Sequence, residues 1–342
     1  MKRLVVLFML AAVAGFGQNC DCSKMMKEII VKVERDYPGF ADKVNVNTKE
    51  EYDAFTKSLL IKASQTSTFN RCTILLDEWV NYFHDEHLHL TMERNQFWTC
   101  KKISDSTVML RLPSFGYDEK TIIDSLVRTN LKEITSTPNL IIDVRGNAGG
   151  IDYSYQCLLP LLYTGPYLSD AVEWYASEGN IKSFEDALAT GNIRKGGEEW
   201  TKHLVQKMKE HRGSFVLIDP PDTVREDTIY AYPRHVWVII DDFCGSSCEE
   251  FILDAKHSSK VTVFGCNTFG VLDYSNTSPE PVVTQGMYIY MPKTCSTRLP
   301  EHPIDNIGIA PDVEINLPYN LNPRDQADSW VVFVKDYLEK KK

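Results

Sequence analysis

The sequence has no apolar run long enough to cross a membrane. A membrane helix needs about 20 consecutive apolar residues, and no stretch after residue 17 reaches that length. At the amino end, Lys2 and Arg3 precede the apolar run 4–14, and small residues lead to Gly17. This order is typical of a secretory signal peptide at 1–17. We therefore expect an exported protein, periplasmic or extracellular, without membrane insertion.

Positive charge is also scarce in this chain. Its 37 Lys and Arg residues are outnumbered by 47 Asp and Glu residues, which gives a formal net charge of −10. Nucleic acids and anionic lipids attract basic surfaces, so this balance argues against both as partners. The nine cysteines can be oxidised in an exported protein, and disulfides are their expected use. Because nine is odd, at least one thiol has no partner within the chain.

Motifs for metals and nucleotides are missing as well. His84, His87 and His89 lie close together in the sequence, but they do not form the His-Glu-x-x-His pattern of metalloproteases. The cysteine spacings match no zinc site. The glycine-containing loop 145–150 fits neither Gly-x-x-x-x-Gly-Lys nor Gly-x-Gly-x-x-Gly. We predict that the protein uses no metal and no cofactor.

The hydrophobic pattern predicts two domains after the signal peptide. The first, at 18–95, is a small helical domain that carries the histidine motif. The second, at 96–342, alternates buried strand-like runs with amphipathic helices, which is typical of an α/β fold. Signals between about 152 and 232 are mostly helical and polar, and we interpret them as a helical insertion. We also expect helices at 24–36, 49–64, 72–84 and 328–339, and a hairpin formed by 281–284 and 287–291.

One serine stands at a position suited to catalysis. The apolar run 236–240 predicts a strand, residues 241–245 break it, and a helix is expected from Cys248. Ser246 lies in the turn, where its hydroxyl can be lifted clear of the sheet and helix N–H groups face any anion beside it. Alternatively, Ser246 or Ser247 caps the helix and a following glutamate completes a capping box.

A glycine pair follows another predicted strand. The apolar residues 140–144 lead to Arg145, which we expect to form a structural ion pair, and then to Gly149 and Gly150. Paired glycines permit close backbone approach and expose N–H groups. A turn with no role beyond its geometry is the alternative.

Four motifs now occur in a recognisable order. They are Asp85-Glu86-His87, the segment 140–150, the Gly245-to-Glu249 turn with Thr268-Phe269-Gly270 after it, and the loop 305–312. Together they resemble the serine peptidases that include the C-terminal processing (tail-specific) proteases and the tricorn core, over roughly residues 80–316. The resemblance implies a spiral ββα core related to the Clp protease and crotonase folds, and a peptide or protein substrate.

The resemblance assigns a role to each of these residues. In that family the serine three positions before a glutamate is the nucleophile, which selects Ser246. Tail-specific members place a lysine base directly after Thr-Phe-Gly, where this chain has Val271. Tricorn-like members use a histidine, matched by His87, and an acid that is usually glutamate, matched by Asp305.

The implied chemistry is acyl transfer. The neutral imidazole of His87, or of His89 as a substitute, would take the proton of Ser246 while its oxygen attacks a carbonyl. Asp305 would fix the tautomer of that imidazole. The N–H of Ser247 and one N–H from Gly149 or Gly150 would receive the oxyanion. Glu86 stands where tricorn-like members have serine.

Other functions remain open at this point. Relatives such as the interphotoreceptor retinoid-binding protein use this fold to carry apolar ligands, so a non-catalytic secreted carrier is the alternative. A cysteine hydrolase based on Cys244 or Cys248 is disfavoured, because disulfide bonding or helix packing suits both residues better. The chain between Leu90 and Thr107 is too short for a PDZ domain, so we expect the insertion or the N-terminal helices to select the substrate. The oligomeric state is not specified.

Overall fold

The computed structural model describes residues 20–85, 87–90, 97–194, 196–281, 287–317 and 328–339. The chain divides between Met92 and Glu93 into two compact units, and residues 315–320 belong with the first. The predicted signal peptide 1–17 and Glu86 lie outside the described residues. Over the ranges given above, no helix is long and apolar enough to span a membrane.

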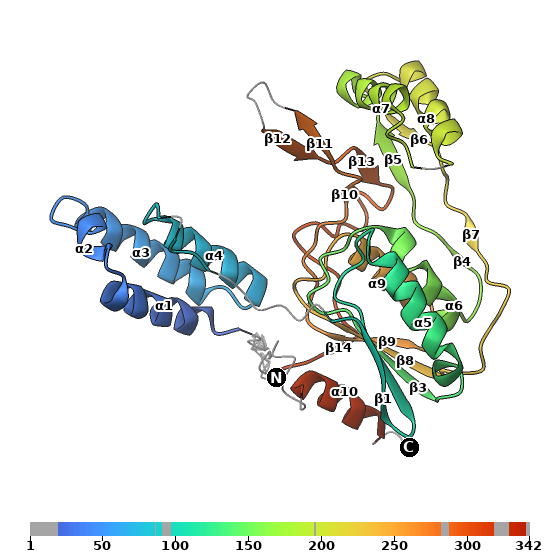
Figure 1. Ribbon diagram of the computed structural model, residues 1–342, viewed down its shortest axis with the longest axis horizontal. Helices are drawn as coiled ribbons and strands as arrows, with labels where there is room; N and C mark the ends of the chain where they lie inside the picture. Colours follow the sequence, from blue (N-terminus) through green and yellow to red (C-terminus); the bar gives the residue numbers. More distant parts are fainter. Residues whose placement is uncertain are drawn as a thin grey trace, which may run out of the picture. The chain divides into compact units, whose positions relative to one another are not determined.

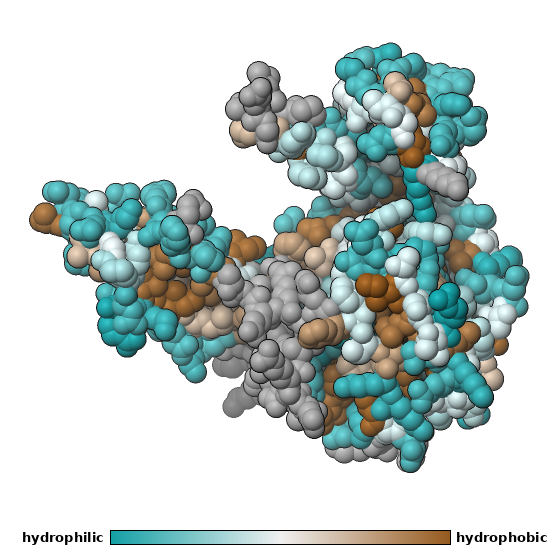
Figure 2. Space-filling view, viewed as in Figure 1, coloured by the Kyte–Doolittle hydropathy of each residue, from teal (hydrophilic) through white to brown (hydrophobic). Residues whose placement is uncertain are grey.

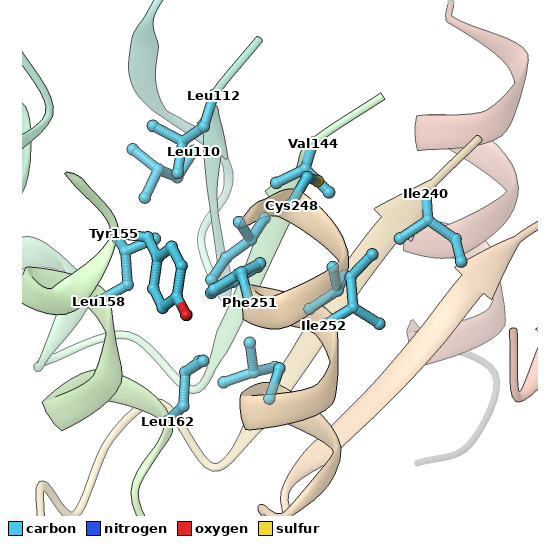
Figure 3. Close-up of a cluster of buried hydrophobic side chains, with 14 of the residues drawn as sticks. Leu110, Leu112, Val144, Tyr155, Leu158, Leu162, Ile240, Cys248, Phe251 and Ile252 are labelled. Carbon is cyan, nitrogen blue, oxygen red and sulfur yellow. The ribbon is translucent and has the colours of Figure 1, made fainter. Parts of the chain in front are cut away.

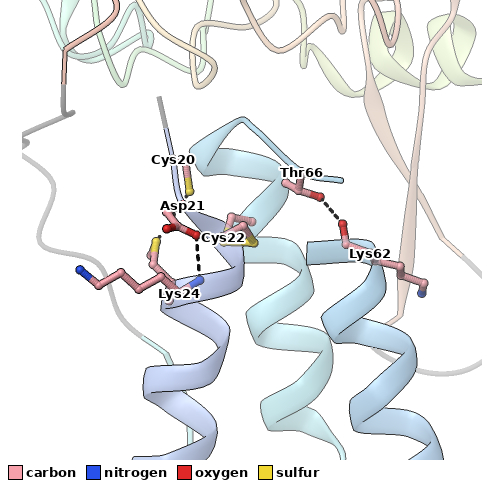
Figure 4. The surroundings of a disulfide bond; sticks show 8 residues. Cys20, Asp21, Cys22, Lys24, Lys62 and Thr66 are labelled. Atoms are coloured by element: carbon pink, nitrogen blue, oxygen red, sulfur yellow. Dashed lines mark hydrogen bonds between the residues drawn. A yellow bond between two sulfur atoms is a disulfide. The ribbon is translucent and has the colours of Figure 1, made fainter. Parts of the chain in front are cut away.

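The first unit is helical. It contains α1 (Cys22–Asp36), α2 (Phe40–Lys43), α3 (Lys49–Ser64) and α4 (Phe69–Asn81), so the helices expected at 24–36, 49–64 and 72–84 are confirmed. Their apolar faces meet around Met26, Leu59 and Trp79, which are fully buried. The disulfide Cys22–Cys72 joins α1 to α4, and the Asp21 carboxylate caps α1 by accepting the Lys24 N–H at 2.9 Å (Figure 4).

The second unit is built on a six-stranded sheet. Its strands, in spatial order, are β1 (Thr99–Ser104), β2 (Thr107–Arg111), β3 (Asn139–Asp143), β8 (His235–Ile240), β9 (Val261–Gly265) and β14 (Val313–Glu314). The strands β2 to β14 are parallel, and β1 is antiparallel to β2. Every residue of β2 and β3 is buried, as expected for parallel strands that are covered on both faces.

Helices cover both faces of this sheet. One face packs against α5 (Lys120–Ile134), α6 (Leu159–Leu162), α9 (Ser247–Lys256) and the short 3₁₀ turns η1 (Asp152–Ser154) and η2 (Gln156–Leu158). Figure 3 shows Tyr155, Phe251 and Ile252 among the side chains of this core. On the other face, α10 (Ser329–Glu339) places Tyr337 against Phe264 of β9. This architecture confirms the predicted α/β class with a small N-terminal helical part.

The end of β3 is tied to α10 by buried charges. The Arg145 side chain is 3% exposed, and its guanidinium donates to Asp143 at 2.6 and 2.8 Å. The same group donates to the Asp328 carboxylate, also at 2.6 Å at its shortest. The structural ion pair predicted for Arg145 is therefore confirmed.

A smaller module rises above the core (Figure 1). Its four-stranded sheet has the order β10 (Tyr274–Ser275), β13 (Thr294–Ser296), β5 (Val172–Tyr175) and β6 (Phe215–Leu217). The helices α7 (Glu178–Thr190) and α8 (Glu198–Glu210) pack on it through Ile181, Leu204 and Met208. The hairpin β11 (Ser278–Pro281) and β12 (Tyr288–Met291) extends from it. The expected hairpin is confirmed, but its first strand lies at 278–281 and not at 281–284; residues 282–286 lie outside the described residues.

The helical insertion predicted at about 152–232 needs correction. Residues 152–162 pack into the main core instead of forming part of an insertion. The remainder contains β5 and β6 together with β4 (Tyr167–Leu168) and β7 (Thr223–Val224), which pair with each other. Strands of two to four residues are too short to show a clear alternation. In addition, β5 pairs with β13, a partner far away in the sequence.

Candidate active site

Ser246 lies at a sharp turn between β8 and α9. Its backbone angles, φ 54° and ψ −127°, belong to a region that non-glycine residues rarely adopt. A strained residue at a strand-to-helix turn is the arrangement that lifts a nucleophile above an α/β sheet. The Ser246 N–H donates to the Glu249 carboxylate at 3.1 Å, which is the acidic half of a capping box. Ser246 is therefore both the cap residue of α9 and the serine of the strand-to-helix turn, the two roles considered from the sequence.

The glycine loop packs directly against this turn. Gly149 has φ 94°, and a Cβ there would lie 2.9 Å from both Ser246 Cβ and Ser247 N. The carbonyl of Asn147 accepts the Gly245 N–H at 3.1 Å, and its side chain accepts the Gly149 N–H at 2.9 Å. Glycine is therefore required at position 149, because the Ser246 turn leaves no room for a Cβ and because φ is positive there.

Two N–H groups beside Ser246 are free to receive a ligand. Among the described residues, no hydrogen bond uses the N–H of Ser247 or of Gly150, and both residues line the same cleft as Ser246. Gly149 instead donates to Asn147. Of the two glycines considered from the sequence, Gly150 is the one with an available donor.

Glu249 fastens the turn to a second loop. Its side chain is completely buried and accepts hydrogen bonds from Thr268 Oγ1 at 2.5 Å and from the N–H groups of Gly270 at 2.8 Å and Val271 at 3.0 Å, besides that of Ser246. Burial raises the pKa of this carboxyl, and the hydrogen bonds oppose the shift. The sequence analysis used Glu249 only to choose between two serines, whereas the structure gives it a central structural role.

Asp305 belongs to the loop that supports this arrangement. Its Oδ1 accepts the N–H groups of Leu272 at 2.7 Å and Asp273 at 2.8 Å. In return, Asp273 Oδ2 accepts the N–H groups of Ile304 at 2.7 Å and Asp305 at 2.8 Å. This reciprocal clamp fixes the backbone next to Val271, whose side chain lines the cleft where tail-specific members of the family would carry lysine.

His87 belongs to the first unit and is fully exposed. The backbone N–H of His87 donates to Asp85 Oδ1 at 3.0 Å, and the imidazole Nδ1 lies 3.6 Å from the same oxygen. The Tyr37 hydroxyl donates to Asp85 Oδ2 at 2.6 Å, and this hydrogen bond is the main cause of the lowered pKa of Asp85. His84 and His89 are exposed as well. A contact between His87 and Asp305 stays a prediction, because the two residues belong to different units.

The cleft above Ser246 separates the core from the smaller module. It has a volume of about 1350 Å³, and its walls include Ser246, Ser247 and Gly150 from the core and Trp174 and Tyr274 from the module. Figure 2 shows the surface hollowed between these two parts. No histidine or lysine is found among the described residues that line it. The described lining of the cleft therefore supplies no imidazole or amine group to Ser246.

Two carboxyl groups on the cleft wall have raised pKa values. Burial raises the pKa of Glu250 to about 8; Arg298, 3.7 Å away, opposes this shift, while Asp152 and Asp170 reinforce it. Burial and the charge of Asp254 raise the pKa of Asp152 to about 6. Neither residue was singled out as a cleft residue from the sequence, because their proximity depends on the packing of η1 against α9.

The cysteines do not provide a nucleophile. Cys244 and Cys248 are completely buried in the core, and burial is the main cause of their raised pKa values. Neither Cys244 nor Cys248 belongs to the disulfide found in the described structure, which joins Cys22 to Cys72. Helix packing is therefore the use found for Cys244 and Cys248. The described residues also contain no group of three or more His, Cys, Asp or Glu side chains placed to hold a metal ion.

A strained serine at a strand-to-helix turn, two free N–H donors beside it and a cleft above it are the arrangement expected of a candidate serine hydrolase site on an α/β core. The family model described as Peptidase family S41 matches residues 106–315. The chain therefore belongs to peptidase family S41 and has the ClpP/crotonase-like core of that family.

Solved structures with a similar fold are distant in sequence. Mature CPAF complexed with lactacystin is 16% identical, with a TM-score of 0.47 over 68% of this chain and 50% of that one. The photosystem II D1 C-terminal processing protease is 15% identical, with a TM-score of 0.40 over 63% and 44%. The tricorn protease is 15% identical, with a TM-score of 0.38 over 69% and 18%. This chain thus spans about half the length of CPAF. A comparison with curated proteins gives no match.

Proposed function

We propose that the protein is an exported peptidase that hydrolyses peptide bonds through an acyl-enzyme on Ser246. The observation that carries this proposal is the geometry of the elbow. Ser246 is held in strained backbone between the free N–H groups of Ser247 and Gly150, and all three line one cleft. A carbonyl carbon attacked by Ser246 would place its oxygen near these two donors. Oxyanion donors of this kind contribute about 3 kcal/mol each to transition-state stabilisation.

His87 is the base in this proposal. A serine hydroxyl is a poor nucleophile near neutral pH and needs a neighbouring base. The described lining of the cleft has no histidine or lysine, while the His87 side chain is exposed and has its Nδ1 beside Asp85. This leaves Nε2 to take the proton from Ser246 and to return it to the leaving amine. A water molecule then attacks the acyl-enzyme by the same proton transfers in reverse.

Two acids compete for the role of orienting His87. The family motif assigns that role to Asp305, whose Oδ1 is occupied by two N–H groups. Asp85 is the acid that lies beside His87 within the first unit. We keep Asp305 as the orienting acid of the triad and treat Asp85 as the local alternative, which a pair of variants can separate.

Export and domain organisation complete the proposal. The disulfide Cys22–Cys72 is the kind of bond that persists in an oxidising compartment, which agrees with a signal peptide at 1–17. We further propose that residues 18–95 form the domain that brings His87, and that residues 96–342 form the catalytic domain. The substrate is a peptide or a protein, and no metal or cofactor takes part.

The direct test is proteolysis by the purified mature protein. A mixture of unfolded proteins is incubated with the wild type or with Ser246→Ala, and new amino ends are identified by mass spectrometry. We expect cleavage products with the wild type alone. Cleavage that persists in Ser246→Ala would reject this nucleophile. A folded wild type that cleaves nothing but retains an apolar ligand would favour the carrier function instead.

A further inference from the structure

The hairpin next to the cleft exposes an unusual amount of apolar surface. The exposed fractions of Met287, Tyr288, Ile289, Tyr290 and Met291 are 56, 62, 49, 69 and 41%. Because side chains alternate between the two faces of a strand, neither face of β12 is covered within the described structure. Figure 1 shows this hairpin as an arm that extends from the smaller module. Exposed apolar surface of this kind commonly marks a site of interaction.

The two edges of the hairpin differ in their capacity to pair with another strand. Ser278 and Glu280 of β11 lie opposite Met291 and Ile289, and Pro279 lies opposite Tyr290. Proline has no N–H, so the residue pairs that exchange hydrogen bonds are those of Ser278 and Glu280. The prolines therefore face the outer edge of β11 and leave it without donors at these positions. Proline on an edge is a common protection against pairing.

The outer edge of β12 has no such protection. If Ile289 and Met291 use their backbone groups toward β11, the N–H and C=O groups of Tyr288 and Tyr290 point away from it. The sheet has two strands in the described structure, β11 and β12, so this edge is unpaired there. A free edge with intact donors is a template for a further strand.

The hairpin is fixed to the module and continues the wall of the cleft. Lys293 is 4% exposed; its Nζ donates to Ser183 Oγ of α7 at 2.7 Å and lies 3.0 Å from Glu280 Oε1 of β11. Residues 274–277 line the cleft and lead without interruption into β11 at Ser278. The chain segment that lines the cleft therefore leads directly into β11, the strand that pairs with β12.

We propose that the free edge of β12 binds an extended apolar segment of the substrate polypeptide as an added strand, while a neighbouring segment lies at Ser246. The unpaired backbone groups call for a polypeptide in extended conformation. The exposed tyrosine, isoleucine and methionine side chains select apolar residues in it, and the continuous wall identifies it with the occupant of the cleft. This site assigns unfolded, apolar polypeptides as the substrate class. The cleavage of such a polypeptide rests on the proposed function, whereas its binding to β12 does not.

The test measures binding without catalysis. The probe is fluorescently labelled, reduced and carboxymethylated α-lactalbumin, and its Kd is measured by fluorescence anisotropy with the Ser246→Ala protein. A second protein adds Tyr288→Pro and Tyr290→Pro, which remove the two outward N–H groups and leave the pairing with β11 intact. The matched control adds Tyr288→Thr and Tyr290→Thr, which remove the rings but keep both donors.

We expect the proline pair to weaken binding by at least about tenfold, because two hydrogen bonds at the edge are lost. The threonine pair should weaken it by clearly less. Equal Kd values for the proline pair and the parent would overturn the proposal. A concentration-dependent dimer that the proline pair abolishes in sedimentation would also overturn it, since a second copy would then occupy the edge.

The same variants on the wild-type background separate this proposal from the catalytic one. We expect the proline pair to raise the KM for the unfolded protein and to leave the cleavage of a peptide of four residues unchanged. If the protein without the proline substitutions binds the unfolded protein but cleaves neither substrate, only the Ser246 mechanism is rejected. Unchanged KM values for both substrates would reject the added strand alone.

Discussion

The two regions that carry the proposed catalytic residues differ in how strongly the structure fixes them. The Ser246 turn is held by Glu249, by the Asn147 loop and by close contact with Gly149, and its strain is supported by a buried core. His87 is fully exposed on a short polar segment, with Asp85 as its neighbour. In the proposed mechanism, the core therefore holds the nucleophile Ser246 in a fixed conformation, and the base His87 belongs to the other unit.

The largest effect on the rate of cleavage is expected from substitution of the exposed His87. His87→Ala should lower the rate of peptide cleavage on the order of 10⁴-fold or more, because the hydroxyl of Ser246 loses its base. The melting temperature should stay within a few degrees, since the side chain is fully exposed. Turnover and thermal unfolding are measured on the same samples. Full activity in this variant would show that another group is the base.

The orienting acid can be identified by two matched variants. Asp305→Asn should lower the rate by about 10³-fold, because an amide favours the wrong tautomer of the imidazole, and Asp85→Asn should lower it much less. Initial rates on one peptide distinguish the two variants. If Asp85→Asn is the more damaging change, the first unit holds the acid as well as the base, and Asp305 serves its loop alone.

The tightness of the elbow is tested at its glycine contact. Gly149→Ala should lower the free energy of unfolding by about 2–4 kcal/mol and reduce activity, because the new Cβ meets Gly245 O at 2.5 Å. Gly146→Ala is the control: its φ is 76°, but no atom lies within 4 Å of the added Cβ, so about 1 kcal/mol is expected. Chemical denaturation measures both. Equal losses would mean that backbone strain alone matters.

The smallest expected effect is a pH-dependent change in stability caused by Glu250 on the cleft wall. The unfolded chain releases the Glu250 proton near pH 4.5, whereas the folded protein keeps it up to about 8. The native state therefore binds more protons between these values, and Glu250 lowers stability as the pH rises through this window. Glu250→Gln should stabilise the protein at pH 9 by at least about 1 kcal/mol and change little at pH 4.

Urea unfolding at both pH values provides the measurement. Glu199→Gln is the matched control, because that side chain is 87% exposed and should alter stability little at either pH. Equal effects of the two substitutions at pH 9 would show that burial of Glu250 does not control the pH dependence.

Local signals made much of the fold predictable. The strands β2, β3 and β8 are continuous apolar runs, and the three long helices of the first unit show clear periodicity, so both were predictable with small errors at the ends. The Ser246 turn was predictable as well, because a strand, a break and a helix follow each other directly. These features depend on residues that are close in sequence.

Features that depend on distant contacts were not predictable. The four-stranded sheet of the module joins β5 and β6 to β10 and β13, and strands this short carry no pattern of their own. The difference between Gly149 and Gly150 follows from a hydrogen bond to Asn147, and the fixing of two loops by Glu249 requires the position of Thr268. Such roles arise from packing between segments that are distant in the sequence, and local sequence patterns do not reveal that packing.

The most direct test of the central claim is labelling of the purified mature protein with a fluorophosphonate probe. Wild type, Ser246→Ala and Ser247→Ala are compared under identical conditions, and circular dichroism verifies that each is folded. The account predicts a covalent label on the wild type and on Ser247→Ala, and none on Ser246→Ala. A folded wild type that takes no label, or a label that survives in Ser246→Ala, would contradict the assignment of Ser246 as an activated nucleophile.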